Sequence, residues 1–176
     1  MSEITAESDP QFLIEFAINC ETVACDESSL RTIAIDVLRQ EGIAEAEISV
    51  AIVGHSDMRR MNREYLDHDF DTDVLSFRLD DNEPGDGSLE GQLVIDAETA
   101  AEAAAEFRWS GREELILYLI HGLLHLAGYD DRTDEDRNSM RIRETALLSR
   151  HGIERSRDLT SSDSPSVRSA ESERTR

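Results

Sequence analysis

The chain is 176 residues long, close to the roughly 100–200 residues of one domain, so a single hydrophobic core is expected. Hydrophobic residues make up 39% and charged residues 32% of the sequence, a balance that excludes a wholly disordered chain. Asp and Glu number 39 against 18 basic residues, all of them Arg, and the formal charge of −21 disfavours long-range attraction of polyanions. A polyanionic ligand therefore needs a local basic patch or a metal ion.

The two ends of the chain differ from its middle in composition. Residues 1–10 are polar and are predicted to be a flexible N-terminus. Residues 154–176 are rich in Ser, Arg, Asp and Glu and contain almost no large apolar side chain. Such a segment cannot bury enough surface to offset its ordering entropy, so we predict a disordered tail. Residues 11–153 are then predicted to be a single domain.

No segment of the sequence has the character of a leader or a membrane span. No basic and apolar stretch follows Met1, and the longest apolar run, Leu115 to Ala127, is interrupted by two histidines. That run is also shorter than the roughly 20 residues that cross a bilayer. Cys20 and Cys25 are too few for a disulfide framework and are expected to be free thiols. These features predict a cytoplasmic protein with no membrane partner.

Hydrophobic periodicity and turn residues predict strands and helices that alternate at first and give way to helices alone. In chain order, we expect a strand at Phe12–Ile18, a helix at Leu30–Glu41, a strand at Ile48–Val53, a helix at Ser56–Leu66, strands at Asp73–Arg78 and Gln92–Ile95, and helices at Ala97–Phe107, Arg112–Ala127 and Glu135–Ser149. Ser56 is the expected N-cap of its helix. The order predicts an α/β (α+β) fold with a small mixed four-stranded sheet, about five helices and an initial β-α-β unit.

The helix at Arg112–Ala127 is apolar nearly all round, which is typical of a helix buried in a core. It contains His121 and His125, which lie four positions apart and therefore on one face of the helix. Gly128 lets the chain leave the helix, and Asp131 follows the turn, ten residues after His121. Two unpaired imidazoles in an apolar helix would cost roughly 1–3 kcal/mol each, so they need partners.

A metal ion is the partner that this spacing favours. Three protein ligands from one helix and its C-terminal turn, His121, His125 and Asp131, leave a fourth position for water, as in catalytic zinc sites. We therefore expect one Zn²⁺ per chain at the end of a buried helix. The metallopeptidase motif H-E-x-x-H needs a Glu after the first His, and Gly122 stands there. We expect this glycine to leave space for a substrate, and a general base to come from elsewhere or from the metal-bound hydroxide itself.

At these residues a resemblance becomes specific. The stretch from His121 to Asp131 resembles the H-G-x-L-H-L-x-G-Y-D-H signature of the YbeY family. Upstream, Met61–Tyr65 and Thr72–Phe77 are similar to the family's L-N-x-x-Y-R and T-D-V-L-S-F motifs, and the matches together span about residues 58–145. The resemblance implies a zinc-dependent, single-strand-specific endoribonuclease that acts in ribosome biogenesis and in ribosomal RNA maturation, at the 3′ end of 16S rRNA.

Four positions depart from the family pattern. Asp131 replaces the final His of the signature, which keeps a zinc ligand but adds negative charge and weakens the ion as a Lewis acid. Leu66 replaces an Arg, Gln92 replaces an acidic residue, and His68 stands where the family usually has Lys. Turnover is therefore expected to be slow.

Several further residues are candidates for the site. His68 is a candidate base, a phosphate contact or a plain surface residue, and Asp130 is expected either to orient a ligand histidine or to cap the turn. Ser76 points either to the core or towards the metal. Arg59 and Arg63 are candidate substrate contacts.

Three hypotheses remain open at this point. The first is the RNA hydrolase, with single-stranded or ribosomal RNA as substrate, a ribosomal subunit or assembly proteins as partners, and no DNA. The second is a zinc metallopeptidase-like hydrolase, and the third is a non-catalytic ribosome-assembly factor that zinc stabilises. Convergence of the arginines of two helices on the metal would favour the first hypothesis, and their dispersal would favour the third. Those arginines are Arg59, Arg60, Arg63, Arg137, Arg141 and Arg143.

Overall fold

A computed structural model describes residues 11–66, 72–83, 85–107, 109–154 and 167–169. Within these ranges the strands are β1 (Phe12–Ile18), β2 (Glu45–Val53), β3 (Val74–Arg78), β4 (Ser88–Asp96) and β5 (Val167–Ser169). The helices are α1 (Glu27–Gln40), α2 (His55–Leu66), α3 (Ala97–Phe107), α4 (Gly111–Leu126) and α5 (Asp134–Arg150). All the predicted elements are present, and β5 is an addition.

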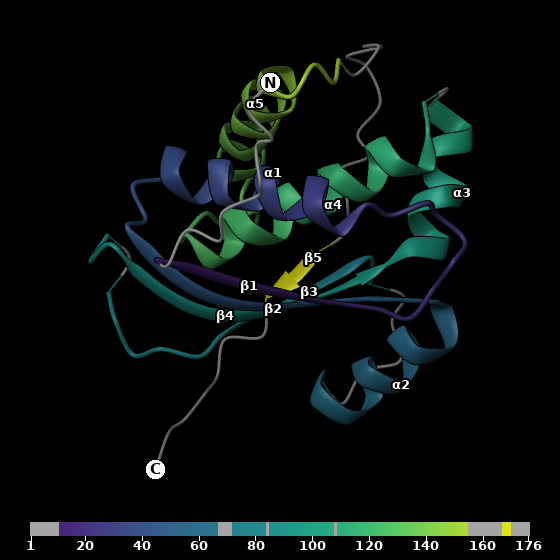
Figure 1. Ribbon diagram of the computed structural model, residues 1–176, viewed down its shortest axis with the longest axis horizontal. Helices are drawn as coiled ribbons and strands as arrows, with labels where there is room; N and C mark the ends of the chain where they lie inside the picture. The colour runs from purple at the N-terminus through teal and green to yellow at the C-terminus, as the bar shows by residue number, and fades with distance from the viewer. Residues whose placement is uncertain (1–10, 67–71, 84, 108, 155–166, 170–176) are drawn as a thin grey trace, which may run out of the picture.

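The strands form one mixed sheet in the order β1-β2-β4-β3-β5 (Figure 1). Strands β1, β2 and β4 are parallel, and β3 runs antiparallel to β4. The α/β class, the mixed sheet of β1 to β4 and the initial β-α-β unit are therefore confirmed. Strand β5 pairs with β3, whose second edge would otherwise present free backbone groups. Its residues lie inside the predicted disordered tail and depart from that prediction. The rest of that tail after residue 154, and the predicted flexible residues 1–10, lie outside the described residues.

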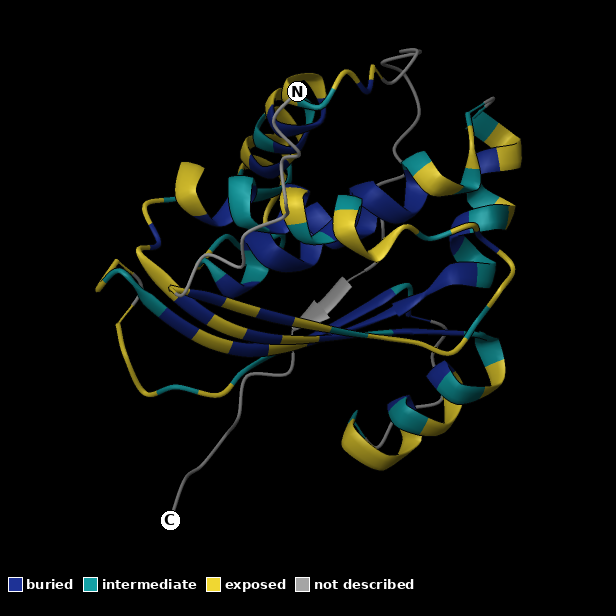
Figure 2. Ribbon diagram, viewed as in Figure 1, coloured by how far each residue is buried: buried dark blue, intermediate teal, exposed yellow. Residues whose placement is uncertain are grey.

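Helix α4 is the centre of the core. It lies on one face of the sheet with α1, α3 and α5, whereas α2 lies on the opposite face (Figure 1). Figure 2 shows that α4 is buried along nearly its whole length, as its apolar sequence predicts. Its close approach to the sheet requires Gly122, because a Cβ there would meet Leu93 Cδ2 at 2.9 Å and Val74 Cγ1 at 3.1 Å. The second half of α4 therefore packs directly on β3 and β4.

The opposite face of the sheet is partly bare, and buried and exposed residues alternate along β1, β2 and β4 (Figure 2). Leu13, Glu47 and Glu90 are exposed and form one row across these three strands. This bare face explains why β2 and β4 begin before Ile48 and Gln92, where they were predicted to start. Exposed glutamates in a strand weaken the apolar signal although the backbone still pairs.

The helix starts also differ from the prediction. Helix α1 begins at Glu27 rather than Leu30, and α2 begins at His55. The backbone N–H of Met58 donates to the carbonyl of Gly54 over 3.0 Å, so Ser56 lies in the first turn and is not the N-cap. The start of α1 was predicted too late because its apolar periodicity begins only inside the first turn. The start of α2 was predicted from Ser56 as a cap, and the helix begins one residue earlier.

Helix α5 is capped at its start and held against the C-terminal part of α1 by two arginines. Thr133 forms a capping box with Asp136 at its start. Arg143 pairs with Glu41 at 2.5 Å, and near the other end Arg150 pairs with Asp36 at 2.8 Å. The hydrogen bond from Arg150 holds the pKa of Asp36 below its ordinary value. These contacts set the position of α5 beside α4.

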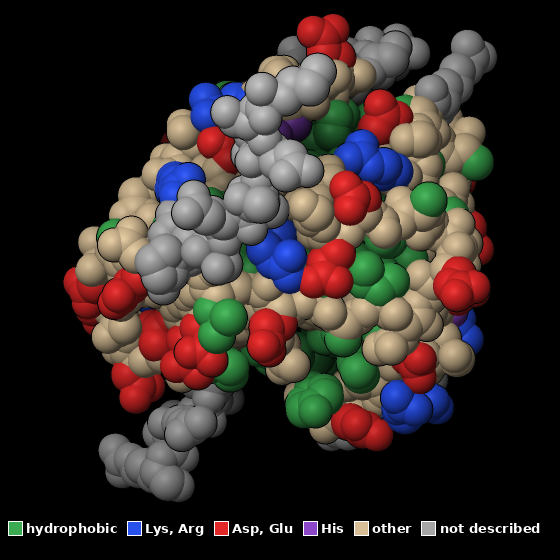
Figure 3. Space-filling model, viewed as in Figure 1, with side chains coloured by type: hydrophobic (Ala, Val, Ile, Leu, Met, Phe, Trp, Pro, Cys, Tyr) green, Lys and Arg blue, Asp and Glu red, His purple; other side chains and the backbone are tan. Residues whose placement is uncertain are grey.

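Membrane character, surface charge and cysteine state were also predicted or implied by the sequence. In the described part of the chain, none of the helices combines the length and the apolar character needed to cross a bilayer. Acidic side chains clearly outnumber basic ones on the face shown in Figure 3, where they gather at the left end of the sheet. Cys20 and Cys25 are free thiols, as predicted.

Candidate metal centre

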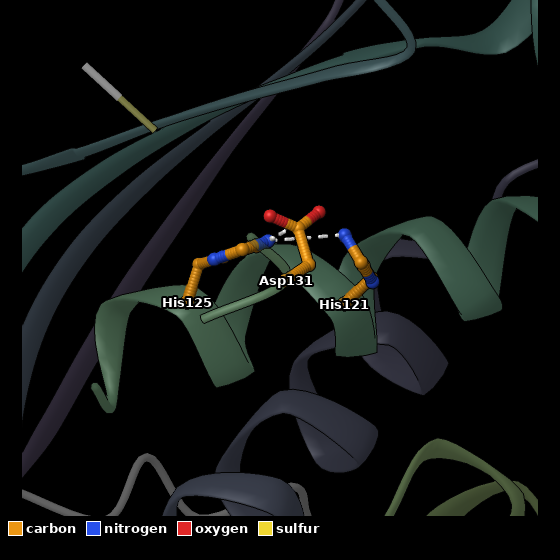
Figure 4. Close-up of side chains that lie close together, drawn as sticks. All are labelled: His121, His125 and Asp131. Carbon is orange, nitrogen blue, oxygen red and sulfur yellow. Dashed lines mark hydrogen bonds and ion pairs between the residues drawn. The ribbon is translucent and has the colours of Figure 1, made fainter. Parts of the chain in front are cut away.

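Helix α4 carries two histidines whose rings meet edge to face. The ring centroids of His121 and His125 are 4.7 Å apart, and their Nε2 atoms are 3.1 Å apart (Figure 4). Both side chains are only 2% exposed. Because the residues are one helical turn apart, the helix alone brings both rings to one point.

The other ring nitrogen of each histidine is already used. Nδ1 of His121 is hydrogen-bonded to the carboxylate of Glu144, and Nδ1 of His125 to the carbonyl oxygen of Tyr129 at 3.1 Å. An ionised carboxylate and a carbonyl can only accept, so each Nδ1 must donate a hydrogen. Each Nε2 then presents a lone pair, and two lone pairs at 3.1 Å repel each other unless a cation lies between them. The geometry thus calls for a proton or a metal ion at this point.

Asp131 completes a group of three ligands. Its carboxylate Oδ2 lies 3.7 Å from Nε2 of His125, and one ligand atom from each of the three residues lies within 4.8 Å of the others (Figure 4). Burial tends to raise the pKa of Asp131, but the hydrogen bond and charge of His125 and the charge of His121 outweigh it and hold the pKa below its ordinary value. The Asp131 side chain is 22% exposed and forms the open side of the group.

The donor set fits zinc. With Zn–N distances of about 2.0–2.1 Å and a tetrahedral angle, two nitrogen ligands lie about 3.3 Å apart. The observed Nε2–Nε2 distance is 3.1 Å, and the third donor is a carboxylate oxygen, also a usual zinc ligand. We call His121, His125 and Asp131, the candidate ligands of one ion, the metal centre.

Comparison with known proteins shows the family to which the chain belongs. The family model described as "Endoribonuclease YbeY" matches residues 15–152. The chain belongs to the YbeY family. A protein of that name from Salinibacter ruber is 41% identical over 128 residues, covering 70% of this chain and 82% of the relative. Its counterpart from Carboxydothermus hydrogenoformans is 39% identical over 155 residues, covering 88% of this chain and 100% of the relative.

A solved structure shows the same fold. The solution structure of TM1509 from Thermotoga maritima aligns with a TM-score of 0.53 at 22% identity. It covers 85% of this chain and 99% of that protein. At this identity the likeness speaks for the fold alone.

One buried residue of this YbeY family member was missed by the sequence analysis. Glu144 of α5 is 4% exposed and holds Nδ1 of His121. The signal was present, since Met140, Glu144, Leu147 and Leu148 are the buried residues of α5 and lie on one face. A glutamate in the apolar stripe of an amphipathic helix is rare unless it has a buried partner.

Of the predicted accessory residues, Asp130 lies next to the metal centre and Ser76 faces helix α4. The Asp130 carboxylate accepts the backbone N–H of Asp131 at 2.8 Å and pairs with Arg132 at 3.3 Å, so it caps the turn and contacts no ligand histidine. Ser76 is buried and lies on the same face of β3 as Val74, towards the second half of α4. His68 lies outside the described residues.

The predicted arginines do not all converge. Arg59 and Arg63 belong to α2, on the far side of the sheet from α4 (Figure 1). Arg137 of α5 does reach the metal centre, where its Nη1 donates to the backbone carbonyl of Asp131 at 2.9 Å. It also pairs with Asp134, so it steadies the turn that carries the third ligand.

Gly122 is a correction to the sequence analysis. We expected it to leave open space for a substrate beside His121. The structure instead turns it to the sheet, where Leu93 and Val74 fill the space a side chain would need. It is a packing residue and gives the substrate no room.

A second group of potential ligands has a structural role. His55, Asp96 and Glu98 also lie close enough to hold an ion. Their side chains, however, already bond to one another and to the backbone. Asp96 Oδ1 accepts the backbone N–H of Glu98 at 3.0 Å, and Asp96 Oδ2 pairs with His55 Nδ1 at 2.7 Å. Glu98 Oε2 accepts the backbone N–H of His55 at 2.6 Å. These bonds satisfy the first turns of α2 and α3.

Proposed function

We propose that this protein is a zinc-dependent endoribonuclease that cleaves single-stranded RNA and acts in ribosomal RNA maturation, at the 3′ end of 16S rRNA. Membership of the YbeY family supports RNA hydrolysis, since the relatives carry the name endoribonuclease. The observation that carries the proposal is the pair of Nε2 atoms, 3.1 Å apart, on two histidines whose Nδ1 atoms are both used as donors.

His121, His125 and Asp131 would hold the ion. When bound, Zn²⁺ supplies Lewis acidity towards a phosphodiester oxygen and activates water for attack. The protein contributes the orientation of both imidazoles and shields them from water, because both histidine side chains are only 2% exposed. RNA approaches on the side of Asp131, which is the most exposed of the three ligands.

The two other hypotheses are not favoured. A metallopeptidase needs a base at position 122, and the side chain of any residue there would point into the contact between α4 and the sheet. A purely structural zinc site is typically closed by four protein ligands, whereas this group offers three. A ribosomal subunit or assembly protein as partner, a cytoplasmic location and the lack of a DNA substrate stay predictions from the sequence.

Metal analysis and RNA cleavage test the proposal together. We expect about one zinc per chain in the wild-type protein and a large loss in His121→Ala and His125→Ala. His55→Ala is the matched control, because it removes an imidazole that is bonded to Asp96 and does not belong to the metal centre. Asp131→His should retain zinc, since histidine is also a zinc ligand.

Cleavage is measured on labelled single-stranded RNA, with duplex RNA and single-stranded DNA of the same sequence alongside. We expect the wild type and His55→Ala to cut only the single-stranded RNA. Equal zinc content in wild type and His125→Ala would refute the metal centre. Equal cleavage in wild type and His121→Ala would show that the nuclease activity belongs to a contaminant.

A further inference from the structure

Glu144 is an unusual residue for its position. It lies on the buried face of α5 with Met140, Leu147 and Leu148, and its side chain is 6% exposed. A carboxylate in such surroundings is destabilising unless a charged or hydrogen-bonding partner compensates for the lost hydration. The partner is Nδ1 of His121 on the neighbouring helix.

We propose that Glu144 is a positioning residue of the metal centre: by accepting the hydrogen of His121 Nδ1, it fixes the tautomer and the ring angle that turn Nε2 to the ion. This inference rests on the metal centre proposed above. Without an acceptor at Nδ1, the His121 ring is free to carry its hydrogen on Nε2, and that tautomer cannot bind a metal through Nε2. Glu144 therefore acts on the ion through His121 and does not touch it.

The two histidines are held by different kinds of group. His125 donates to a backbone carbonyl, that of Tyr129, which no side-chain substitution removes. His121 donates to a side chain of another helix, twenty-three residues further along the chain. A change at position 144 thus perturbs one ligand and leaves the other as an internal reference.

Glu144 also brings a second carboxylate to the neighbourhood of the metal centre, where Asp131 is the first. Carboxylates that accept from a metal-bound histidine typically raise metal affinity by about 10–100-fold. Glu144→Gln keeps the shape and one acceptor oxygen but removes the charge.

A structural role for Glu144, as a buried pair joining α4 and α5, makes a different prediction. It would lower stability on substitution without a specific effect on zinc. Glu114 is the matched control, since it is 2% exposed and accepts from Trp109 Nε1 at 2.6 Å. Glu114 lies on α4, the helix that carries His121, seven residues before that histidine and about 10 Å from it along the helix axis.

The experiment uses the full chain as wild type, Glu144→Gln, Glu144→Ala and Glu114→Gln. Zinc affinity is measured by competition with a chromogenic chelator, and melting is followed in parallel. We expect Glu144→Gln to lower the zinc affinity about 10-fold and Glu144→Ala towards 100-fold. Glu114→Gln should stay within about twofold of wild type even where its melting temperature falls.

Imidazole ¹⁵N–¹H spectra of the zinc-loaded protein give an independent measurement. The wild type should show His121 protonated on Nδ1 and bound through Nε2. In Glu144→Ala the Nδ1–H signal of His121 should be lost to exchange, while that of His125 persists.

The outcomes separate the two levels of the argument. Absence of zinc from the wild type overturns the metal centre and this inference with it. Three results would overturn the role of Glu144 alone. The first is a zinc affinity of Glu144→Gln equal to that of the wild type, and the second is a loss of zinc affinity in Glu114→Gln as large as in Glu144→Gln. The third is a spectrum that shows His121 bound to zinc through Nδ1. The wild-type spectrum decides even where a variant fails to fold.

Discussion

Gly122 offers a sharp test of how the fold limits the chemistry of the metal centre. The substitution Gly122→Glu completes the H-E-x-x-H pattern of zinc peptidases while leaving His121 and His125 in place. A Cβ at this position, however, meets Leu93 Cδ2 at 2.9 Å and Val74 Cγ1 at 3.1 Å, and both side chains are fully buried. The new carboxylate would enter the contact between helix and sheet and could not act as a base.

The size of the effect follows from two opposed contributions. Gly122→Ala gains about 1 kcal/mol of helix propensity, and overpacking costs about 1–3 kcal/mol, so a net loss of about 0–2 kcal/mol is expected. Gly122→Glu adds an unpaired buried charge, which costs several kcal/mol more. That total is comparable with the roughly 5–15 kcal/mol by which a domain is stable. We expect Gly122→Ala to fold and Gly122→Glu to be largely unfolded.

Circular dichroism during urea and thermal denaturation measures both variants, and a peptide substrate tests for proteolysis. Ala105→Glu, at an exposed position of α3, controls for the introduction of a glutamate into a helix. The reasoning is refuted by a Gly122→Glu protein that melts within a few degrees of wild type, or that hydrolyses the peptide.

Three further predictions concern stability. The hydrogen bond that His55 Nδ1 donates to the Asp96 carboxylate raises the pKa of His55. The stabilisation from this pair is therefore complete below the ordinary pKa of about 6.5 and is lost as pH rises through the raised value. The melting difference between wild type and His55→Gln should shrink from about pH 5.5 to about pH 9, and a constant difference would contradict this. Glu47 faces Glu90 across β2 and β4, so Glu47→Gln should raise the free energy of unfolding by about 0.2–1 kcal/mol, with a larger gain at low salt; an unchanged or lower urea midpoint counts against it. Truncation after Glu154 removes the three residues of β5 that pair with β3, so we expect the thermal midpoint to fall only slightly, and a large drop would mean that the tail contributes to the packing of the domain.

The sequence was informative wherever one residue pattern had one physical cause. An apolar surface all round predicted that α4 lies in the core, and the burial of nearly every residue of that helix confirms it. The start of β4 was missed because Ser88 and Glu90 face the bare side of the sheet, where polar residues satisfy solvent while the backbone pairs with β2. Pairing partners of this kind are distant in the chain and leave no local signal.

In the metal centre, too, local spacing was predictable and contacts between distant segments were not. Helical spacing alone predicted that His121 and His125 meet, and a short turn can deliver Asp131. The apolar stripe of α5 marks Glu144 as buried, but its partner His121 lies on another helix, and only tertiary packing brings the two side chains together. Gly122 was misinterpreted for a related reason: its neighbours Leu93 and Val74 lie on other strands.

The charge of −21 bears on how such a centre meets RNA. Many arginines of the described residues are already paired with carboxylates, among them Arg31, Arg60, Arg78, Arg137, Arg143 and Arg150. These side chains stabilise helices and loops, and moving them to phosphates would expose their acidic partners. Attraction of free RNA is then weak, because affinity for a polyanion grows with the number of phosphates that basic groups neutralise. On the proposed function, we therefore expect the cation of the metal centre to supply the local positive charge, and a partner to present RNA beside Asp131.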